Sequence, residues 1–86
     1  MKKKIAILGS TGSIGKTTFN ILKKNKKDFD IILLSTNKNI KILLKQAYLF
    51  NVKNLIITDK KKFLEIKNKL SKEKIKVFNN FDDLDK

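Results

Sequence analysis

Cysteine and histidine are both missing from this sequence, and the two absences exclude thiolate and imidazole chemistry. Without cysteine there is neither a disulfide framework nor a thiolate metal site, as is usual for cytoplasmic proteins. Without histidine the chain lacks the commonest metal ligand and the commonest general base. We therefore expect a cytoplasmic protein whose 86 residues include no catalytic residue and no metal ligand.

Long hydrophobic runs are missing as well. The lysines at positions 2–4 resemble the start of a signal peptide, but the apolar run that follows, from Ile5 to Leu8, ends at Gly9. A secretory signal needs an apolar core of roughly 7 to 15 residues, and a membrane-spanning helix needs about 20. The sequence therefore predicts neither export nor a membrane partner.

Arginine is absent too, although the chain carries a net charge of +13. All 21 basic residues are lysine and are spread along the chain, whereas nucleic-acid surfaces usually include arginine for its planar fork of donors. Lysine, isoleucine and asparagine, which all have A/T-rich codons, make up almost half of the sequence. We therefore attribute the charge to the codon bias of an A/T-rich genome and expect no nucleic-acid partner. A free-standing basic interaction module is the alternative.

Four short apolar runs are separated by longer polar segments, and each run is expected to be a β-strand. The runs span residues 5–8, 31–34, 55–57 and 75–78. The first three are continuous rather than alternating. We therefore expect both of their faces to be buried, as in parallel strands that are covered by helices.

Apolar residues recur at helical spacing between these runs. Three helices are predicted. The first runs from about Ser13 to Lys24, with a stripe formed by Ile14, Thr18, Ile21 and Leu22, and the second runs from about Lys38 to Phe50, with a stripe formed by Ile40, Leu43, Leu44 and Ala47. The third follows Asp59, a plausible N-cap, and its stripe is formed by Phe63, Ile66 and Leu70. Asn25 and Asn51 are suited to end the first two, because asparagine tolerates the left-handed conformation. The order β-α-β-α-β-α-β predicts an α/β fold, a Rossmann-like parallel sheet that forms the first half of a dinucleotide-binding domain.

Three glycines, Gly9, Gly12 and Gly15, follow the first strand and open the first helix. Their spacing, G-x-x-G-x-x-G, is a variant of the G-x-G-x-x-G turn of dinucleotide-binding domains. The first glycine permits the tight turn, the second lets the backbone approach a pyrophosphate, and the third lets the helix pack closely on the strand. The free N–H groups and the positive end of the helix then face the phosphates, and the hydroxyls of Thr11 and Ser13 add hydrogen bonds.

A second nucleotide-binding motif overlaps the same turn. Gly15-Lys16-Thr17 matches the end of a P-loop, G-x-x-x-x-G-K-[ST], and Leu55 to Asp59 imitates a Walker B strand. The chain has Ser10 at the position of the first glycine of that motif. A P-loop needs this glycine so that its backbone amides can wrap around the β-phosphate. A P-loop nucleotide hydrolase is therefore kept as the alternative, and the dinucleotide turn is preferred.

The second strand is followed by Asn37, Lys38 and Asn39, where an NAD-binding domain places an acid for the ribose 2′-hydroxyl. An acid would repel a 2′-phosphate, whereas a lysine between two asparagines offers a cation and amide donors. These residues therefore favour NADP over NAD. The alternative is that Lys38 is one more surface lysine and that Asn39 only caps the next helix.

The run Ile7–Gly15, then Asn25 and Phe29, and then Lys38–Ile40 resembles the start of the 1-deoxy-D-xylulose 5-phosphate reductoisomerase family, in which GSTGSIG is close to a signature. The resemblance assigns the pyrophosphate region of NADPH to Thr11, Gly12, Ser13 and Ile14. It assigns the adenosine side to Lys38 and Asn39, and Asn37 stands where the family usually has glycine.

By the same resemblance, the complete enzyme rearranges 1-deoxy-D-xylulose 5-phosphate and reduces it with NADPH to 2-C-methyl-D-erythritol 4-phosphate in non-mevalonate isoprenoid synthesis. It is implied to need Mg²⁺ or Mn²⁺ and to work as a homodimer. Its metal and phosphosugar ligands lie beyond the matched segment. We therefore expect residues 1–86 to be a partial NADP-binding domain that is inactive without the catalytic and C-terminal domains, and another NADP-dependent reductase is an alternative. The acids Asp82, Asp83 and Asp85 are interpreted as the start of a further helix, not as a metal site.

Overall fold

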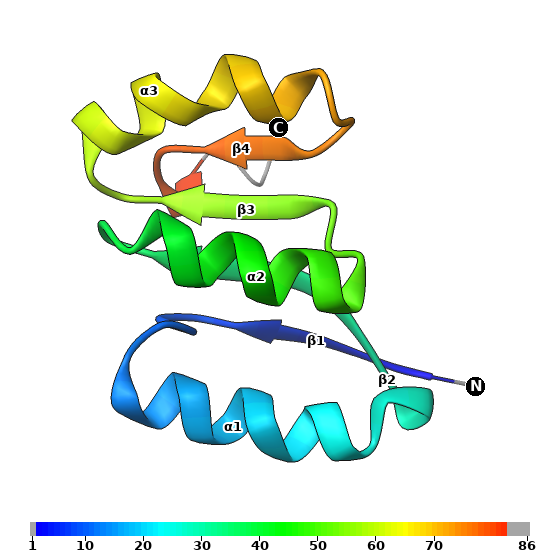
Figure 1. Cartoon of the computed structure of the whole chain (residues 1–86). Coiled ribbons are helices and arrows are strands. Elements are labelled where there is room, and N and C mark those ends of the chain that lie inside the picture. Colours follow the sequence, from blue (N-terminus) through cyan, green and yellow to red (C-terminus); the bar gives the residue numbers. More distant parts are fainter. Residues whose placement is uncertain (1, 83–86) are drawn as a thin grey trace.

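A computed structural model describes residues 2–82 of the chain (Figure 1). The elements follow one another as strand β1 (Lys3–Ile7), helix α1 (Ser13–Lys24), a short 3₁₀ turn (Lys26–Asp28), strand β2 (Phe29–Thr36), helix α2 (Ile40–Phe50), strand β3 (Asn54–Ile57), helix α3 (Lys60–Ser71) and strand β4 (Lys76–Phe78). This order confirms the predicted alternation of strands and helices.

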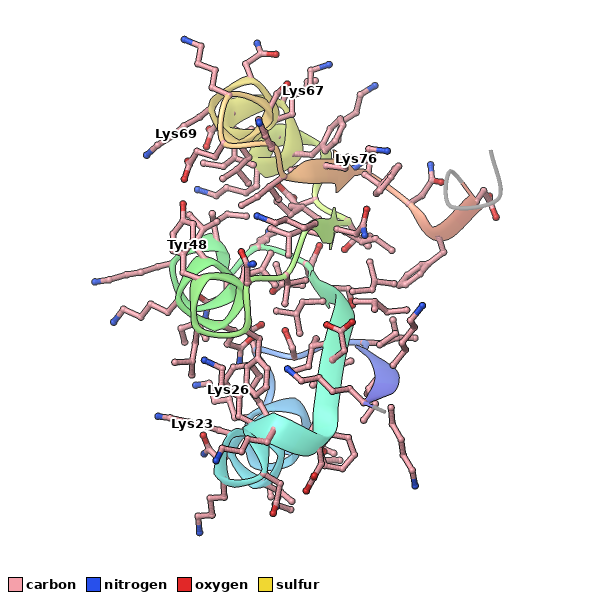
Figure 2. The ribbon with its side chains drawn as sticks, turned by 90° about the vertical axis from the view of Figure 1, so that its right-hand side faces the viewer. Lys23, Lys26, Tyr48, Lys67, Lys69 and Lys76 are labelled. Atoms are coloured by element: carbon pink, nitrogen blue, oxygen red, sulfur yellow. The ribbon has the colours of Figure 1, made fainter. Side chains whose placement is uncertain are left out.

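The four strands form one parallel sheet in the order β1-β2-β3-β4. Each strand is joined to its neighbour through a helix, and such crossovers are nearly always right-handed. Because the strands are added in one direction with the same crossover hand, the three helices lie together on one face of the sheet (Figure 2). The predicted Rossmann-like α/β class is therefore confirmed, with helices on a single face in the described part of the chain.

The hydrophobic core lies between this face and the helices. From the sheet it contains Ile31, Leu34, Leu55 and Ile57, and from the helices mainly Leu43, Ala47, Phe50 and Leu70. The register of β1 against β2 shifts by one residue between Ile5 and Ala6, which leaves Ile32 as the extra residue of β2. This irregularity turns both Ile31 and Leu34 toward the helices.

The expectation that the first three strands are buried on both faces is wrong for β1 and for part of β2. Ala6 is exposed in β1, Ile32 is 41% exposed in β2, and Leu8 follows β1 with 59% exposure. The physical reason is the single-sided helix layer, which covers only one face of the sheet in residues 2–82. Only β3 meets the expectation fully, since Leu55, Ile56 and Ile57 are all buried.

The predicted bounds of α1 are confirmed, but of the predicted stripe only Leu22 is buried. Ile14 is 84% exposed and Ile21 is 58% exposed, whereas Gly15, Phe19 and Leu22 are buried. The Phe19 ring packs edge-on against the Phe50 ring of α2, with centroids 5.2 Å apart. The helix is therefore rotated so that its glycine, and the residues four and seven positions later, face inward.

The helix ends are set by short polar side chains, largely as predicted. Asp59 caps α3 by accepting the N–H of Lys62 at 3.0 Å, and Asn51 ends α2 in the left-handed region with φ 55°. Asn25 ends α1 differently, since its φ is −120° and its side-chain amide donates to the Ile21 carbonyl. None of the helices within residues 2–82 has the length and apolar character needed to cross a membrane.

The single-sided core makes a prediction about stability. Leu55→Ala should lower the free energy of unfolding by about 2–5 kcal/mol, because it removes a fully buried side chain between the sheet and the helices. Ile32→Ala, on the uncovered face, should cost less than about 1 kcal/mol. Urea unfolding followed by circular dichroism measures both values. Equal losses would contradict a main core that lies on the helix-covered face.

Candidate functional site at the glycine-rich turn

The glycine-rich turn connects the carboxyl end of β1 to the first turn of α1. It borders a cavity of about 540 Å³ that is lined by Ile7, Leu8, Gly9, Gly12, Ser13, Ile14, Gly15 and Thr18. In parallel α/β sheets, ligands bind outside the carboxyl ends of the strands. The cavity therefore lies where this architecture places a ligand.

The three glycines have different structural roles. Gly9 has φ 67°, a conformation that L side chains rarely adopt, so it makes the tight turn off β1. A Cβ on Gly15 would overlap the Gly9 carbonyl oxygen and would lie 2.7 Å from the Ser10 Cα, so α1 can approach the turn only with glycine there. A Cβ on Gly12 would meet only the Gly9 carbonyl oxygen, at 3.5 Å, which is ordinary contact. The fold therefore requires Gly9 and Gly15, whereas Gly12 keeps space open.

The first half of the turn is held by the end of β2. The Gly9 N–H donates to the Ser35 hydroxyl at 2.8 Å, and the Ser10 N–H donates to the Ser35 carbonyl at 2.9 Å. The hydroxyls of Thr11 and Thr36 share a hydrogen bond of 2.7 Å. Sequence reasoning missed Ser35 and Thr36, although two hydroxyl residues ending a buried apolar strand were a usable signal. Both are buried, so they fix the turn rather than face solvent.

The second half of the turn leaves the N-terminus of α1 open. Asn39 caps α2 and Asp59 caps α3 with side-chain oxygens, but the N-cap of α1 is Gly12, which has no side chain to accept a hydrogen bond. The first N–H groups of a helix have no partner within the helix, and the helix dipole adds partial positive charge there. Open space at Gly12 and free donors at Ser13 and Ile14 together fit a phosphate group.

The residues after β2 lie at the same edge of the sheet. The Thr36 hydroxyl contacts Thr11 in the turn and also accepts the N–H of Asn39 at 3.3 Å. The side chain of Asn39 accepts the Ile42 N–H, so the alternative interpretation that it caps α2 is correct for its amide oxygen. Asn37 accepts the Thr58 hydroxyl at 2.9 Å, and Lys38 is exposed. None of residues 37–39 lines the cavity at the turn, and Thr36 is the residue that links them to the turn.

The backbone of the turn differs from what a P-loop requires. A P-loop aims successive backbone amides at a phosphate. Here the N–H groups of Gly9 and Ser10 donate to Ser35, and the N–H of Gly12 donates to the Gly9 carbonyl at 3.0 Å. The Thr17 hydroxyl donates to the Ser13 carbonyl within α1. Within motif positions 10–17, the Ser10 and Gly12 N–H groups and the Thr17 hydroxyl are therefore used inside the fold, whereas the first N–H groups of α1 stay open.

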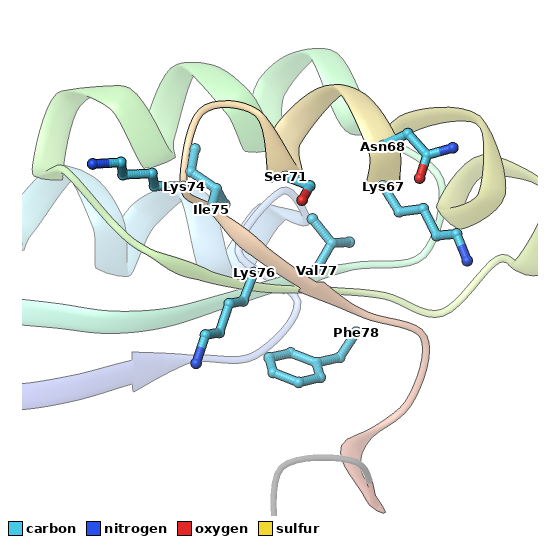
Figure 3. A pocket seen from close by; sticks show the side chains of 8 residues that line it. All are labelled: Lys67, Asn68, Ser71, Lys74, Ile75, Lys76, Val77 and Phe78. Carbon is cyan, nitrogen blue, oxygen red and sulfur yellow. The ribbon is translucent and has the colours of Figure 1, made fainter.

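A cavity of similar size, about 580 Å³, lies between α3 and β4, at the opposite edge of the sheet from β1 (Figure 3). Its lysines, Lys67, Lys74 and Lys76, are exposed. In residues 2–82, no three histidine, cysteine, aspartate or glutamate side chains are grouped so that they could hold a metal ion. Asp82 is exposed, and Asp83 and Asp85 lie outside the described residues.

Parallel strands, a glycine-rich turn after β1 and an uncapped α1 define the Rossmann-like class of nucleotide-binding α/β domains. Within this class the sequence profile of one family, 1-deoxy-D-xylulose 5-phosphate reductoisomerase, matches residues 5–85. The chain belongs to the 1-deoxy-D-xylulose 5-phosphate reductoisomerase family.

Individual relatives agree with this assignment. The chain is 57% identical over 84 residues to the reductoisomerase of Pelagibacter ubique, covering 98% of this chain and 22% of that protein. It is 41% identical over 75 residues to that of Wolbachia pipientis subsp. Culex pipiens, covering 87% of this chain and 19% of the relative. The chain thus spans about a fifth of the length of the curated relatives it matches.

Solved structures share the fold. The reductoisomerase of Zymomonas mobilis in complex with NADPH superposes with a TM-score of 0.81 and 28% identity, covering 91% of this chain and 21% of that one. A second reductoisomerase, in complex with magnesium, superposes with a TM-score of 0.73 and 23% identity, covering 91% of this chain and 19% of that one, and supports the fold alone.

We expect substitutions at Gly15 and Gly12 to have opposite effects on the free energy of unfolding. Gly15→Ala should lower the free energy of unfolding by about 1–3 kcal/mol or more, because its methyl group meets backbone atoms that cannot move aside. Gly12→Ser should keep or raise that free energy, since there is space for the side chain and serine is a preferred N-cap. Denaturant unfolding decides between them. Comparable losses in the two variants would show that the turn is packed equally tightly at both glycines.

Proposed function

We propose that this chain is the NADPH-binding part of a 1-deoxy-D-xylulose 5-phosphate reductoisomerase. The complete enzyme rearranges 1-deoxy-D-xylulose 5-phosphate and reduces it to 2-C-methyl-D-erythritol 4-phosphate in non-mevalonate isoprenoid synthesis. NADPH supplies the hydride of that reduction. The observation that carries the proposal is the open N-terminus of α1, uncapped and fronted by space at Gly12. Family membership and the NADPH complex of the Zymomonas mobilis neighbour support the same ligand.

The pyrophosphate is assigned to residues 11–14. Gly12 provides the space for its approach, and the N–H groups of Ser13 and Ile14 are donors at the positive end of α1. The Ser13 hydroxyl is exposed at the same helix end. Thr11 is tied to Thr36 through its hydroxyl, so its backbone N–H is the group left to donate. The exposed side chain of Ile14 borders the cavity and offers an apolar wall.

The adenosine side of NADPH is assigned to Asn37, Lys38 and Asn39. Lys38 is exposed and no acid accompanies it between Thr36 and Ile40, so this segment offers the 2′-phosphate of NADP a cation. The neighbouring acid is Asp59, whose N–H donates to the Asn37 carbonyl at 3.1 Å and whose carboxylate caps α3 by accepting the Lys62 N–H. Asn39 uses its side-chain oxygen to cap α2, which leaves its amide NH₂ for a ligand. The Asn37 side chain accepts the hydroxyl of Thr58, the residue after β3, and we assign Asn37 to the ribose side of the site.

The remaining functions belong to parts of the complete protein outside residues 1–86. We assign to those parts the ligands for Mg²⁺ or Mn²⁺, the phosphosugar site and the homodimer contacts, so the chain alone has no reductoisomerase activity. The proposed location is cytoplasmic. Neither nucleic acid nor membrane is a proposed partner, because the exposed lysines point outward from separate elements. Figure 2 shows Lys23 and Lys26 at the far side of the molecule from Lys67 and Lys69.

Titration of the purified chain with NADPH, NADH and ATP tests the proposal. Gly12→Val should weaken NADPH binding at least about tenfold while the chain stays folded, because the side chain fills the space of the pyrophosphate. Thr17→Val is the matched control, since its hydroxyl bonds only within α1 and should not matter to NADPH. Isothermal calorimetry gives the affinities.

Two results would contradict this account. Comparable NADPH affinity in Gly12→Val and wild type would show that the turn does not hold the phosphates. Tight ATP–Mg²⁺ binding that is lost in Thr17→Val would instead assign the turn to a P-loop, in which that hydroxyl contacts the metal.

Coenzyme choice is a separate prediction. Lys38→Glu should weaken NADPH at least about tenfold more than NADH, because only NADPH carries the 2′-phosphate and a charge-assisted contact is worth about 1.5–3 kcal/mol. Lys41→Glu makes the same charge change in the first turn of α2 and should have a small effect on both coenzymes. Titrations of each variant and of the wild type with NADPH and with NADH give the ratios of their dissociation constants. Equal losses of NADPH and NADH in Lys38→Glu would place Lys38 away from the 2′-phosphate.

A further inference from the structure

One buried polar side chain, Gln46 of α2, contacts the glycine-rich turn. Its Nε2 donates to the Ser10 carbonyl oxygen at 2.9 Å, across 36 residues of sequence. Gln46 is 6% exposed and Ser10 is fully buried, so solvent does not compete for this bond. Gln46 does not line the cavity at the turn, and it lines instead a separate cavity between α1 and α2.

The hydrogen bond fixes the direction of one peptide unit. The Ser10 carbonyl and the Thr11 N–H belong to the same planar trans peptide, in which C=O and N–H point opposite ways. Because the Ser10 oxygen points toward Gln46 in α2, the Thr11 N–H points away from α2. The Thr11 hydroxyl is held separately by Thr36. Gln46 thus orients the backbone N–H of Thr11, and Thr36 orients its hydroxyl.

Half of the Gln46 amide is unsatisfied. Its Oε1 is buried without a hydrogen-bond partner within the described residues, and such an acceptor costs about 1–3 kcal/mol. Rotating the amide would not help, because Oε1 would then face the Ser10 carbonyl, another acceptor. A methionine of similar length would remove the orphaned Oε1 but would leave the buried Ser10 carbonyl oxygen without its donor, so each residue leaves one buried acceptor unsatisfied. What glutamine adds at this position is therefore the hydrogen bond that holds the Ser10 carbonyl in one direction.

We propose that Gln46 is a positioning residue that orients the Ser10–Thr11 peptide so that the glycine-rich turn binds the NADPH pyrophosphate. The inference rests on the proposed function, because it concerns the same site. Gln46 acts through the turn and does not touch the ligand.

Gln46→Met tests the proposal through binding and stability together. NADPH and ADP, which both carry a pyrophosphate, should lose affinity by about tenfold, the scale of one lost buried hydrogen bond. Adenosine 2′-phosphate lacks the pyrophosphate and should bind as to wild type. The free energy of unfolding should change little, because the variant loses the orphaned Oε1 but leaves the Ser10 carbonyl oxygen without a donor. Tyr48→Phe is the control on the same helix: it removes a hydrogen bond to Glu73 far from the turn and should leave all three affinities unchanged.

Gln46→Glu provides a second readout, a pH profile. An ionised carboxylate would face the Ser10 carbonyl as a second acceptor, whereas a protonated carboxyl can donate to it. Burial raises the pKa of such a carboxyl, so lowering the pH should restore the bond. The ratio of variant to wild-type Kd for NADPH should therefore fall toward one between about pH 8 and pH 5. The pH profile of Gln46→Glu tests the role of Gln46 even if Gln46→Met does not fold.

The outcomes separate the two proposals. Wild-type protein that fails to bind NADPH overturns the proposed function and this inference with it. Wild-type protein that binds NADPH, together with Gln46→Met of equal affinity, or a Gln46→Glu ratio that does not change with pH, overturns the role of Gln46 alone. If Gln46→Met lost affinity for adenosine 2′-phosphate and for NADPH to the same extent, the fold would be loosened in general. That result would also overturn the positioning role of Gln46.

Discussion

The close approach of α1 to the turn at Gly15 determines how the rest of this end of the molecule is arranged. A Cβ at that position would overlap the Gly9 carbonyl, so the helix can sit there only with its glycine facing the turn. That orientation fixes the rotation of α1, because Phe19 and Leu22 lie four and seven residues later on the same face. Phe19 then reaches Phe50 of α2, which links the site to the core. The same rotation leaves Ile14 outward, beside the cavity.

The turn divides into a half that is committed to the fold and a half that is open. Gly9 and Ser10 give their N–H groups to Ser35, and the Ser10 carbonyl accepts from Gln46. Beyond Gly12 the backbone enters a helix whose first donors have no side-chain cap. A ligand phosphate would therefore meet donors that are already held in place, and little ordering would be needed on binding. The fixed backbone of Gly9 and Ser10 therefore holds the free N–H groups of α1 in position for a phosphate.

Much of the fold was predictable because it depends on local patterns. Strand and helix order, the Asp59 cap and the left-handed Asn51 all follow from short-range sequence signals. The face of α1 was not predictable from apolar spacing, since the inward position is a glycine chosen for its lack of a side chain. The exposure of Ala6 and Ile32 depends on strand order, which hydrophobic runs do not encode.

The glycines of the site were predictable for the same reason, but its supports were not. The roles of Gly9 and Gly15 are confirmed by a positive φ and by a backbone contact, and the role of Gly12 toward a ligand stays a prediction. Ser35 and Gln46 reach the turn from 25 or more residues away, and no spacing rule connects them to it. Only the folded chain brings the ends of β1 and β2 together with one side of α2.

The central claim is that the open end of α1 and the adjoining turn hold the pyrophosphate of NADPH. Nuclear magnetic resonance of the ¹⁵N-labelled chain during a titration with NADPH tests it most directly, because amide shifts report weak binding residue by residue. We predict saturable shifts centred on the amides of Thr11, Ser13 and Ile14, reproduced by ADP, with little change at Lys76 or Phe78 in the other cavity. Shifts centred on that second cavity, or none at the turn under saturating NADPH, would contradict the claim.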